Sequence, residues 1–132
     1  MILYVGILVE AAGNWRIRIA GLPECTGLGP SPKDAFFNVT DSMRRLMAHK
    51  LSAGHKLAAP LTLAEVLKSG ELAPGETTIF VPLLMDSGRT VRVNVTLDAG
   101  LLLAVDLEAE RRELTRSAFF ASAARDKLER WI

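Results

Sequence analysis

The chain has 132 residues, of which 49% are hydrophobic and 23% charged, and 16 Lys and Arg nearly balance 15 Asp and Glu. This composition excludes an intrinsically disordered chain, and no apolar run approaches the roughly 18 residues that span a bilayer. The net charge of +1 also argues against an extended basic surface for nucleic acid. We expect no signal peptide, and with Cys25 as the sole cysteine we expect a cytoplasmic protein without disulfides or membrane contact.

The N-terminal quarter predicts a β-hairpin. Ile2–Val9 is rich in aliphatic and β-branched residues, as in a buried strand, and Trp15–Ile19 alternates polar and apolar side chains, as in a half-exposed strand. Ala11–Asn14 between them is a turn signal. We expect Gly21–Gly29 to be a loop with room for a short third strand around Cys25.

A long helix follows the hairpin. Ser31 is the candidate N-cap, Pro32 stands at the first helical position, and Asp34 favours the helix dipole in the first turn. We expect the helix to run from Pro32 to about Ser52 and to stop near Gly54. Its apolar stripe has helical spacing and consists of Ala35, Phe36, Val39, Met43, Leu46 and Met47.

The middle of the chain predicts a short helix and a strand. Thr62 and Glu65 have the spacing of a capping box for a helix that ends at Gly70. Thr78–Met85 is an apolar run typical of a strand. Asp86–Gly88 is either a hairpin turn or a short linker to the last third of the chain.

The last third predicts a strand and two helices. The strand is Arg89–Leu97, Asp98 is the N-cap of the first helix, and Thr115 is the candidate N-cap of the second. The apolar face of the strand carries Val91, Val93, Val95 and Leu97. Its polar face carries Arg92, Asn94 and Thr96.

This last segment is too small to fold alone, because it is close to the roughly 40 residues below which a chain needs metal, disulfides or association. Its single strand also needs a partner for its backbone groups. A symmetric homodimer, in which two copies of Val91–Leu97 pair antiparallel, meets both needs. Whether such dimers pair further into tetramers stays open.

The polar face of such a two-stranded ribbon suits the DNA major groove. Arg92 can donate two hydrogen bonds to guanine, Asn94 can pair with adenine, and Thr96 offers a hydroxyl and a methyl group. The start of the last helix offers free N–H groups, a guanidinium and hydroxyls to a phosphate. The residues there are Thr115, Arg116 and Ser117. The alternative is an ordinary surface strand with polar side chains.

The segment from Arg92 to Phe120 resembles the ribbon-helix-helix family of dimeric DNA-binding repressors. The resemblance is carried by Arg92–Asp98, Leu101, Leu102, Ala109 and Leu114–Phe119. It implies that Arg92, Asn94 and Thr96 read bases and that Arg116 and Ser117 lie near phosphate. The family usually has a left-handed Gly between its helices. Here Glu113 stands in that place, at a cost on the order of 1 kcal/mol, so the turn is expected to be strained or reshaped.

The N-terminal part resembles the HicB-type antitoxins. The resemblance rests on the order of elements and on Leu22–Cys25, Gly29 and Ser31–Ala35. Glu24 and Ile19–Gly21 depart from the usual residues of the family. The resemblance implies a truncated ribonuclease-H-like module that occludes a small HicA-type ribonuclease toxin, joined to a module that represses its own operon at a palindromic operator.

These observations define an α+β protein. Residues 1–86 are expected to form the HicB-like partner-binding module of hairpin, helix and strand, and residues 87–132 the dimerising ribbon-helix-helix. Exposed candidates for toxin contacts lie on the strand Trp15–Ile19 and on the polar face of the long helix. They are Trp15, Arg16, Arg18, Arg44 and Arg45, although Trp15 could equally belong to the core.

We expect neither an enzyme nor a cofactor. The carboxylates of the first module fall in caps and turns and do not converge as two-metal phosphodiester chemistry requires. His49 and His55 are wrongly spaced for one helical face, so no metal site is expected, and Cys25 has no base nearby. A stand-alone repressor with a ligand-sensing or oligomerising N-terminal module is the alternative function, and a nuclease ranks last.

The charge balance also bears on DNA binding. Neither module is basic overall, so phosphate attraction supplies little affinity, and we expect weak non-specific binding together with dependence on base contacts.

Overall fold

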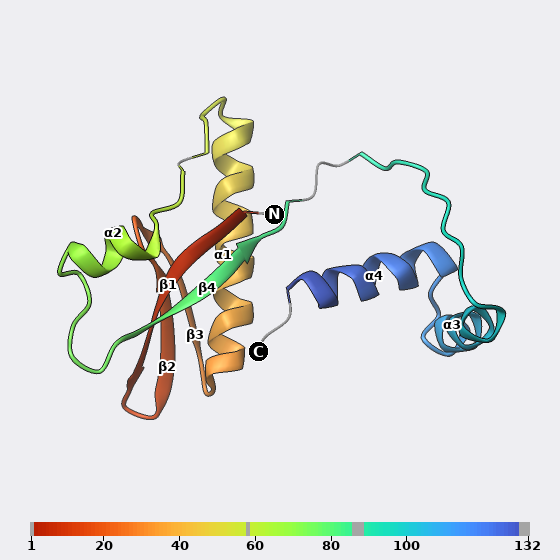
Figure 1. Ribbon diagram of the computed structural model, residues 1–132, viewed down its shortest axis with the longest axis horizontal. Coiled ribbons are helices and arrows are strands. Elements are labelled where there is room, and N and C mark those ends of the chain that lie inside the picture. Colours follow the sequence, from red (N-terminus) through yellow and green to blue (C-terminus); the bar gives the residue numbers. More distant parts are fainter. Residues whose placement is uncertain (1, 58, 86–88, 130–132) are drawn as a thin grey trace. The chain divides into compact units, whose positions relative to one another are not determined.

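The computed structural model describes residues 2–57, 59–85 and 89–129 (Figure 1). The chain divides into two compact units, within Met1–Met85 and within Asp86–Arg130. Together they contain both helices and strands, so the mixed α and β composition expected from the sequence is confirmed. Among the described residues, no helix has the length and apolarity to cross a membrane.

The described part of the first unit is built on a four-stranded antiparallel sheet of order β3-β2-β1-β4. Its central strands are β1 (Ile2–Ala11) and β2 (Asn14–Ile19), and its edges are β3 (Leu22–Gly29) and β4 (Thr77–Leu83). The turn between β1 and β2 places Ala12 at φ 52° and Gly13 at φ 79°. Two successive positive φ values are typical of a type I′ turn, whose twist matches that of the two strands.

Strand β3 is longer than the sequence suggests. The expectation was a loop with a short strand near Cys25, yet the ladder with β2 extends from Ile19↔Leu22 to Trp15↔Gly29, with an irregularity between Arg18 and Ile19. The Gly and Pro content of this segment disfavours a strand locally, but pairing along the β2 edge supplies the hydrogen bonds that outweigh this preference.

Helix α1 (Pro32–Ser52) covers one face of the sheet and has the predicted bounds. The Ser31 hydroxyl accepts a hydrogen bond from the Asp34 amide at 3.2 Å, which confirms the predicted N-cap. The buried face of α1 packs on β1, β2, β3 and β4 in the main core. Its buried helical members are Ala35, Phe36, Val39, Met43 and Met47.

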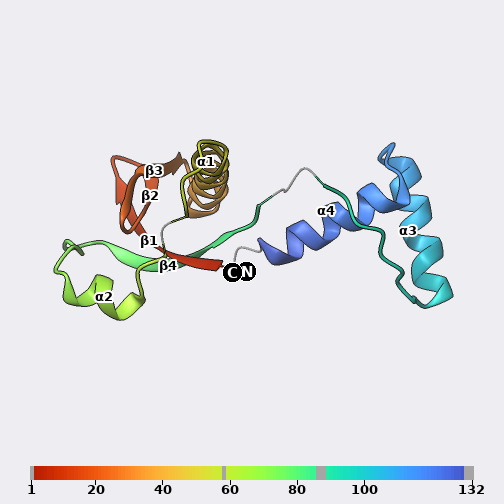
Figure 2. The same cartoon turned by 90° about the horizontal axis from the view of Figure 1, so that it is seen from above.

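Helix α2 (Leu63–Lys68) lies on the opposite face of the sheet, as Figure 2 shows. Both hydrogen bonds of the predicted capping box are present: the Thr62 hydroxyl accepts from the Glu65 amide at 3.1 Å, and a Glu65 carboxylate oxygen accepts from the Thr62 amide at 2.8 Å. The buried Val66 packs against a second apolar cluster formed by Val5, Ile7 and Ala20.

The second unit contains α3 (Ala99–Arg111) and α4 (Arg116–Leu128), with the predicted caps Asp98 and Thr115. Its buried apolar residues include Val105 and Ala109, both on α3. Few apolar side chains of this unit are shielded from solvent within one chain, which agrees with the expectation that it lacks a sufficient core of its own.

The turn between these helices keeps the left-handed geometry. Glu113 has φ 58°, its amide donates to the Glu110 carbonyl at 3.0 Å, and the Leu114 amide donates to the Ala109 carbonyl at 2.8 Å. These two bonds are those of a Schellman C-cap, in which glycine normally holds the position of Glu113. The turn is therefore strained and not reshaped.

One predicted element is absent from the described chain. Residues Arg89–Leu97 were expected to form a strand, but in this single chain they carry no strand assignment and precede α3 as irregular backbone (Figure 1). The physical reason is that a strand is defined by its ladder, and no described strand of the same chain pairs with this segment.

Candidate functional site

The segment before α3 exposes its apolar side chains as fully as its polar ones. Val91 and Val93 are each 74% exposed and Val95 is 66% exposed, values that are unusual for three alternating valines. Arg92, Asn94 and Thr96 are exposed as well. One chain therefore covers neither face of the segment.

A hollow of about 280 Å³ lies between this segment and the helices of the second unit. Its lining consists of apolar side chains from the segment and from the two helices, together with three of the predicted DNA contacts. The polar lining residues are Asn94, Arg116 and Ser117. The structure thus brings together one predicted base reader and two predicted phosphate contacts, which the sequence places more than twenty residues apart.

The start of α4 has the cap that the sequence predicts. The Thr115 hydroxyl accepts a hydrogen bond from the Ala118 amide at 3.1 Å, and Arg116 and Ser117 are exposed at the first two helical positions. Amides in the first turn of a helix lack intrahelical partners and carry the positive end of the helix dipole. This helix start therefore has the chemistry to accept an anion.

Arg116 is held by a carboxylate that the sequence analysis overlooked. Its Nε and Nη2 donate to the two carboxylate oxygens of Asp106 on α3, at 2.9 Å and 2.8 Å. The hydrogen bonds from Arg116 lower the pKa of Asp106 below its usual value. No local sequence signal points to the pair, because it depends on the path of the chain through the α3–α4 turn.

A second carboxylate near the same turn pairs with two arginines. Glu108 accepts from Nε of Arg111 at 3.0 Å and from Nε of Arg112 at 2.7 Å. Hydrogen bonds from both arginines lower the pKa of Glu108 from 4.5 to about 2. All three arginines around the turn are thus paired within the unit, with two carboxylates between them.

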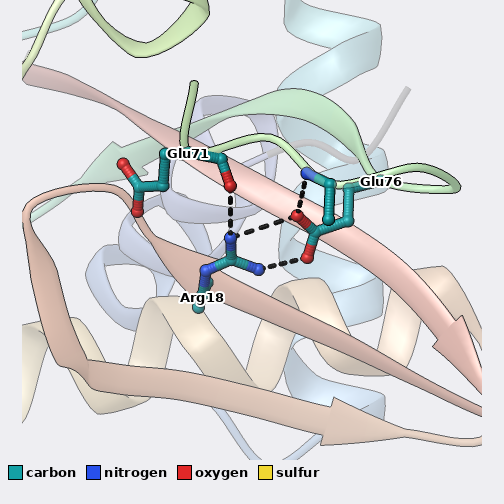
Figure 3. Close-up of polar contacts among 4 residues, drawn as sticks. Arg18, Glu71 and Glu76 are labelled. Carbon is teal, nitrogen blue, oxygen red and sulfur yellow. Dashed lines mark hydrogen bonds and ion pairs between the residues drawn. The ribbon is translucent and has the colours of Figure 1, made fainter. Parts of the chain in front are cut away.

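In the first unit, Arg18 lies in a polar cluster and is not the freely exposed side chain expected of a partner contact. Its guanidinium forms a two-pronged ion pair with the carboxylate of Glu76, and Nη2 also donates to the Glu71 backbone carbonyl at 3.4 Å (Figure 3). The Arg18 side chain is 22% exposed and that of Glu76 only 8%. The pair ties β2 to the segment that leads into β4.

Glu76 is correspondingly stabilised as an anion. The main cause is the set of hydrogen bonds that Arg18 donates to the Glu76 carboxylate. The Ala73 amide adds to this effect, because it donates to the same carboxylate at 2.8 Å. Together they lower the pKa of Glu76 from 4.5 to about 2.

The other candidate toxin contacts differ in exposure. Arg45 is 74% exposed and pairs with Asp41 at 3.0 Å, whereas Arg44 is 27% exposed and its Nε donates to the Leu84 carbonyl at 3.1 Å. Arg16 is exposed, while Trp15 is half-buried and packs against the main core. The expectation of exposure is therefore wrong for Arg18 and Arg44, which are partly buried. For Trp15, which the sequence left open, the structure favours the core. Tertiary partners distant in sequence bury all three.

The sequence analysis also missed an exposed apolar surface on the sheet. Leu3 on β1 is 47% exposed and Phe80 on β4 is 54% exposed. Their strands are paired, with Leu3 opposite Pro82 and Phe80 opposite Val5. The apolar run at Thr78–Met85 indicated a strand, but nothing in it distinguished a covered face from an open one.

The described residues do not combine groups suited to metal chemistry. Among them, no set of three or more His, Cys, Asp and Glu side chains is placed to hold a metal ion. Cys25 is fully buried, and this burial, with a smaller effect of Glu24, raises the pKa of its thiol and keeps it protonated. A protonated, inaccessible thiol is a poor nucleophile.

The described part of the chain thus combines a sheet unit with a pair of capped helices. Residues 5–124 match the family model described as HicB_like antitoxin of bacterial toxin-antitoxin system. The chain therefore belongs to the HicB-like antitoxins. Membership of this family indicates a regulatory protein with an antitoxin role. No curated protein matches the sequence.

Solved structures have a similar fold. The crystal structure of the antitoxin HicB of Burkholderia pseudomallei matches with a TM-score of 0.60 and 21% identity, over 97% of this chain and 99% of that one. The N-terminal domain of the same antitoxin matches with a TM-score of 0.54 and 14% identity, over 63% of this chain and 98% of that one. A chain of the HicA3 and HicB3 toxin-antitoxin complex matches with a TM-score of 0.53 and 14% identity, over 64% and 99%.

Proposed function

We propose that this antitoxin neutralises a HicA-type ribonuclease toxin through its first unit and represses its own operon as a dimer through its second. The two roles belong to different parts of the chain. The observation that carries the proposal is the alternating segment Arg89–Leu97, exposed as far as Thr96, in front of two capped helices.

The second unit supports the DNA-binding role. Val91, Val93 and Val95 lie exposed in one chain, and pairing of two such segments in a ribbon-helix-helix dimer would remove their apolar surface from water. The same pairing would turn Arg92, Asn94 and Thr96 of both chains outward, toward the base edges of a major groove. Thr115, Arg116 and Ser117 would then lie near the DNA backbone, as their position at a helix start favours.

The first unit supports the toxin-binding role. The matched chain in the HicA3 and HicB3 complex covers 64% of this chain. The isolated N-terminal domain of the Burkholderia pseudomallei antitoxin HicB covers a nearly equal share, 63%. A module of that size therefore suffices for the fold found in a toxin complex. On the first unit, the exposed cations Arg16 and Arg45 remain the candidate contacts with the least burial.

Two arginine variants test the DNA-binding role. Arg92→Ala should abolish the preference for operator DNA over other sequences, because it removes a base contact. Arg116→Ala should weaken binding to every sequence and flatten its salt dependence, because it removes a phosphate contact. Both are measured by fluorescence anisotropy on a duplex from upstream of the gene and on a shuffled duplex. Identical behaviour of the two variants would contradict the assigned roles.

Co-expression tests the toxin-binding role. The chain should relieve the growth arrest caused by the product of the short reading frame beside its gene and should co-purify with it. A chain that represses its operon but neither rescues growth nor co-purifies with that product would instead be a stand-alone repressor.

A further inference from the structure

The ion pair between Arg116 and Asp106 lies where the proposed DNA interface needs a free cation. The two hydrogen bonds, at 2.9 Å and 2.8 Å, occupy Nε and Nη2 of the guanidinium. This is the two-pronged edge with which arginine binds a carboxylate or a phosphate equally well. In this chain the edge is already taken by Asp106.

The pair is accessible to solvent and adjacent to other predicted DNA contacts. The side chains of Arg116 and Asp106 are 56% and 41% exposed. Arg116 lines the same hollow as Asn94 and Ser117, so an approaching DNA backbone would meet the guanidinium together with its carboxylate partner.

A phosphate has two ways to engage such an arginine. It can displace Asp106, at the cost of the existing ion pair, or it can share the guanidinium with Asp106 and meet the repulsion of a second anion. Either way, the gain from the contact is smaller than that of an unpaired arginine. The neighbouring Arg111 and Arg112 share the single carboxylate of Glu108, so both are already engaged, although the three residues together keep one net positive charge.

We propose that Asp106 is an internal competitor of the DNA phosphate for Arg116 and so sets the sequence-independent part of the DNA affinity. This inference rests on the proposed DNA-binding function. It also gives a structural basis to the weak non-specific DNA binding that the charge balance of the sequence predicts. Arg116, the cation at the start of α4, is neutralised by a carboxylate of its own chain. Sequence discrimination then depends on the residues of the ribbon.

The opposite role for Asp106 makes the opposite prediction. If Asp106 served to orient Arg116 toward a phosphate, removing its charge would release the guanidinium and weaken binding. The sign of the change in DNA affinity therefore separates competition from positioning.

The test compares Asp106→Asn with Glu110→Gln, which removes the same charge from an exposed position on the same helix. Affinities for the upstream and shuffled duplexes are measured by fluorescence anisotropy over a range of salt concentrations, with helix content followed by circular dichroism. Asp106→Asn should bind both duplexes more tightly than Glu110→Gln. The expected gain in affinity is about two- to fivefold for each Arg116–Asp106 ion pair that the substitution removes. For Asp106→Asn, the plot of log affinity against log salt should be steeper by about 0.9 for each phosphate gained.

A double-mutant cycle assigns the effect to Arg116. In an Arg116→Gln background, Asp106→Asn and Glu110→Gln should change the affinity equally, because the competed cation is absent. In the chain that keeps Arg116, equal affinities of Asp106→Asn and Glu110→Gln would contradict the competitor role of Asp106. Weaker DNA binding by a folded Asp106→Asn variant would contradict it as well. Neither result would bear on the proposed DNA-binding function. Failure of every variant to bind either duplex at low salt would overturn the proposed DNA-binding function as well.

Discussion

Arg18 and Glu76 are 58 positions apart in the sequence, yet they form the most buried ion pair described in the first unit. Each residue alone suggests an exposed charge, and the sequence analysis placed Arg18 among the toxin contacts. Only the fold reveals that this guanidinium fixes the connection into β4. Long-range polar pairs of this kind leave no local pattern of spacing, so sequence reasoning could not find them.

The Arg18–Glu76 pair predicts a loss of stability in acid. Because the pKa of Glu76 is lowered from 4.5 to about 2, the folded state favours the charged carboxylate. Its contribution to the free energy of unfolding is present above the ordinary pKa and is lost as the pH falls from about 5 toward 2. Glu76→Gln should therefore lose about 1 to 3 kcal/mol at neutral pH and show a weaker acid dependence in urea unfolding.

The matched control for this variant is Glu71→Gln. Glu71 meets Arg18 through its backbone carbonyl, so its side-chain charge is not needed for the contact. Its unfolding should follow the wild-type pH dependence. If both variants lose stability and acid dependence to the same extent, the Arg18–Glu76 pair is not the cause.

Glu113 predicts a gain in stability from a single substitution. Its φ of 58° strains a non-glycine residue in the Schellman turn between α3 and α4. Glu113→Gly should raise the free energy of unfolding by about 0.5 to 1 kcal/mol, measured by thermal or urea unfolding. Glu113→Ala removes the same charge but keeps the strain, and an equal gain in that variant would contradict the explanation.

At the scale of elements, the sequence predicted best what is determined locally. The helix bounds at Pro32 and Ser52 and the caps at Ser31, Thr62 and Thr115 follow from hydrogen bonds within a few residues, and the structure confirms them. The extent of β3 was underestimated because its pairing partner, not its own composition, decides it.

The approach of α1 to β3 requires a residue without a side chain. A Cβ at Gly27 would lie 2.3 Å from the Val39 nitrogen and 2.4 Å from the Ala35 oxygen, both backbone atoms of α1. Gly27→Ala should therefore destabilise the chain by about 1 to 3 kcal/mol in urea unfolding. Leu28→Ala, at an adjacent side chain that is 60% exposed, should change stability by less than about 0.5 kcal/mol.

The segment Arg89–Leu97 makes a prediction about association. Under the proposed ribbon, Val93→Asp would place two charges in the apolar core of the dimer and should give monomers that bind no DNA. Thr96→Ala, on the opposite face, should remain dimeric. Sedimentation of both variants measures this, and a Val93→Asp variant that stays dimeric would contradict the ribbon.

At the scale of the whole molecule, the family was predictable and the partner surface was not. The order of elements, together with Leu22–Cys25, Gly29 and Ser31–Ala35, was enough to point to HicB-like antitoxins, and the match over residues 5–124 confirms this family. The strand at Arg89–Leu97 stays a prediction, because its hydrogen-bonding partner would be a second chain. The toxin contacts stay predictions too, and burial has reduced the exposed candidates to Arg16 and Arg45.

The central claim is that one chain binds a toxin and forms a DNA-binding dimer. It is tested most directly by the native mass of the full chain co-expressed with the product of the adjacent short reading frame. The account predicts a complex that contains an even number of antitoxin chains together with bound toxin. A monomeric antitoxin, or a dimer that leaves the toxin free and active, would contradict it.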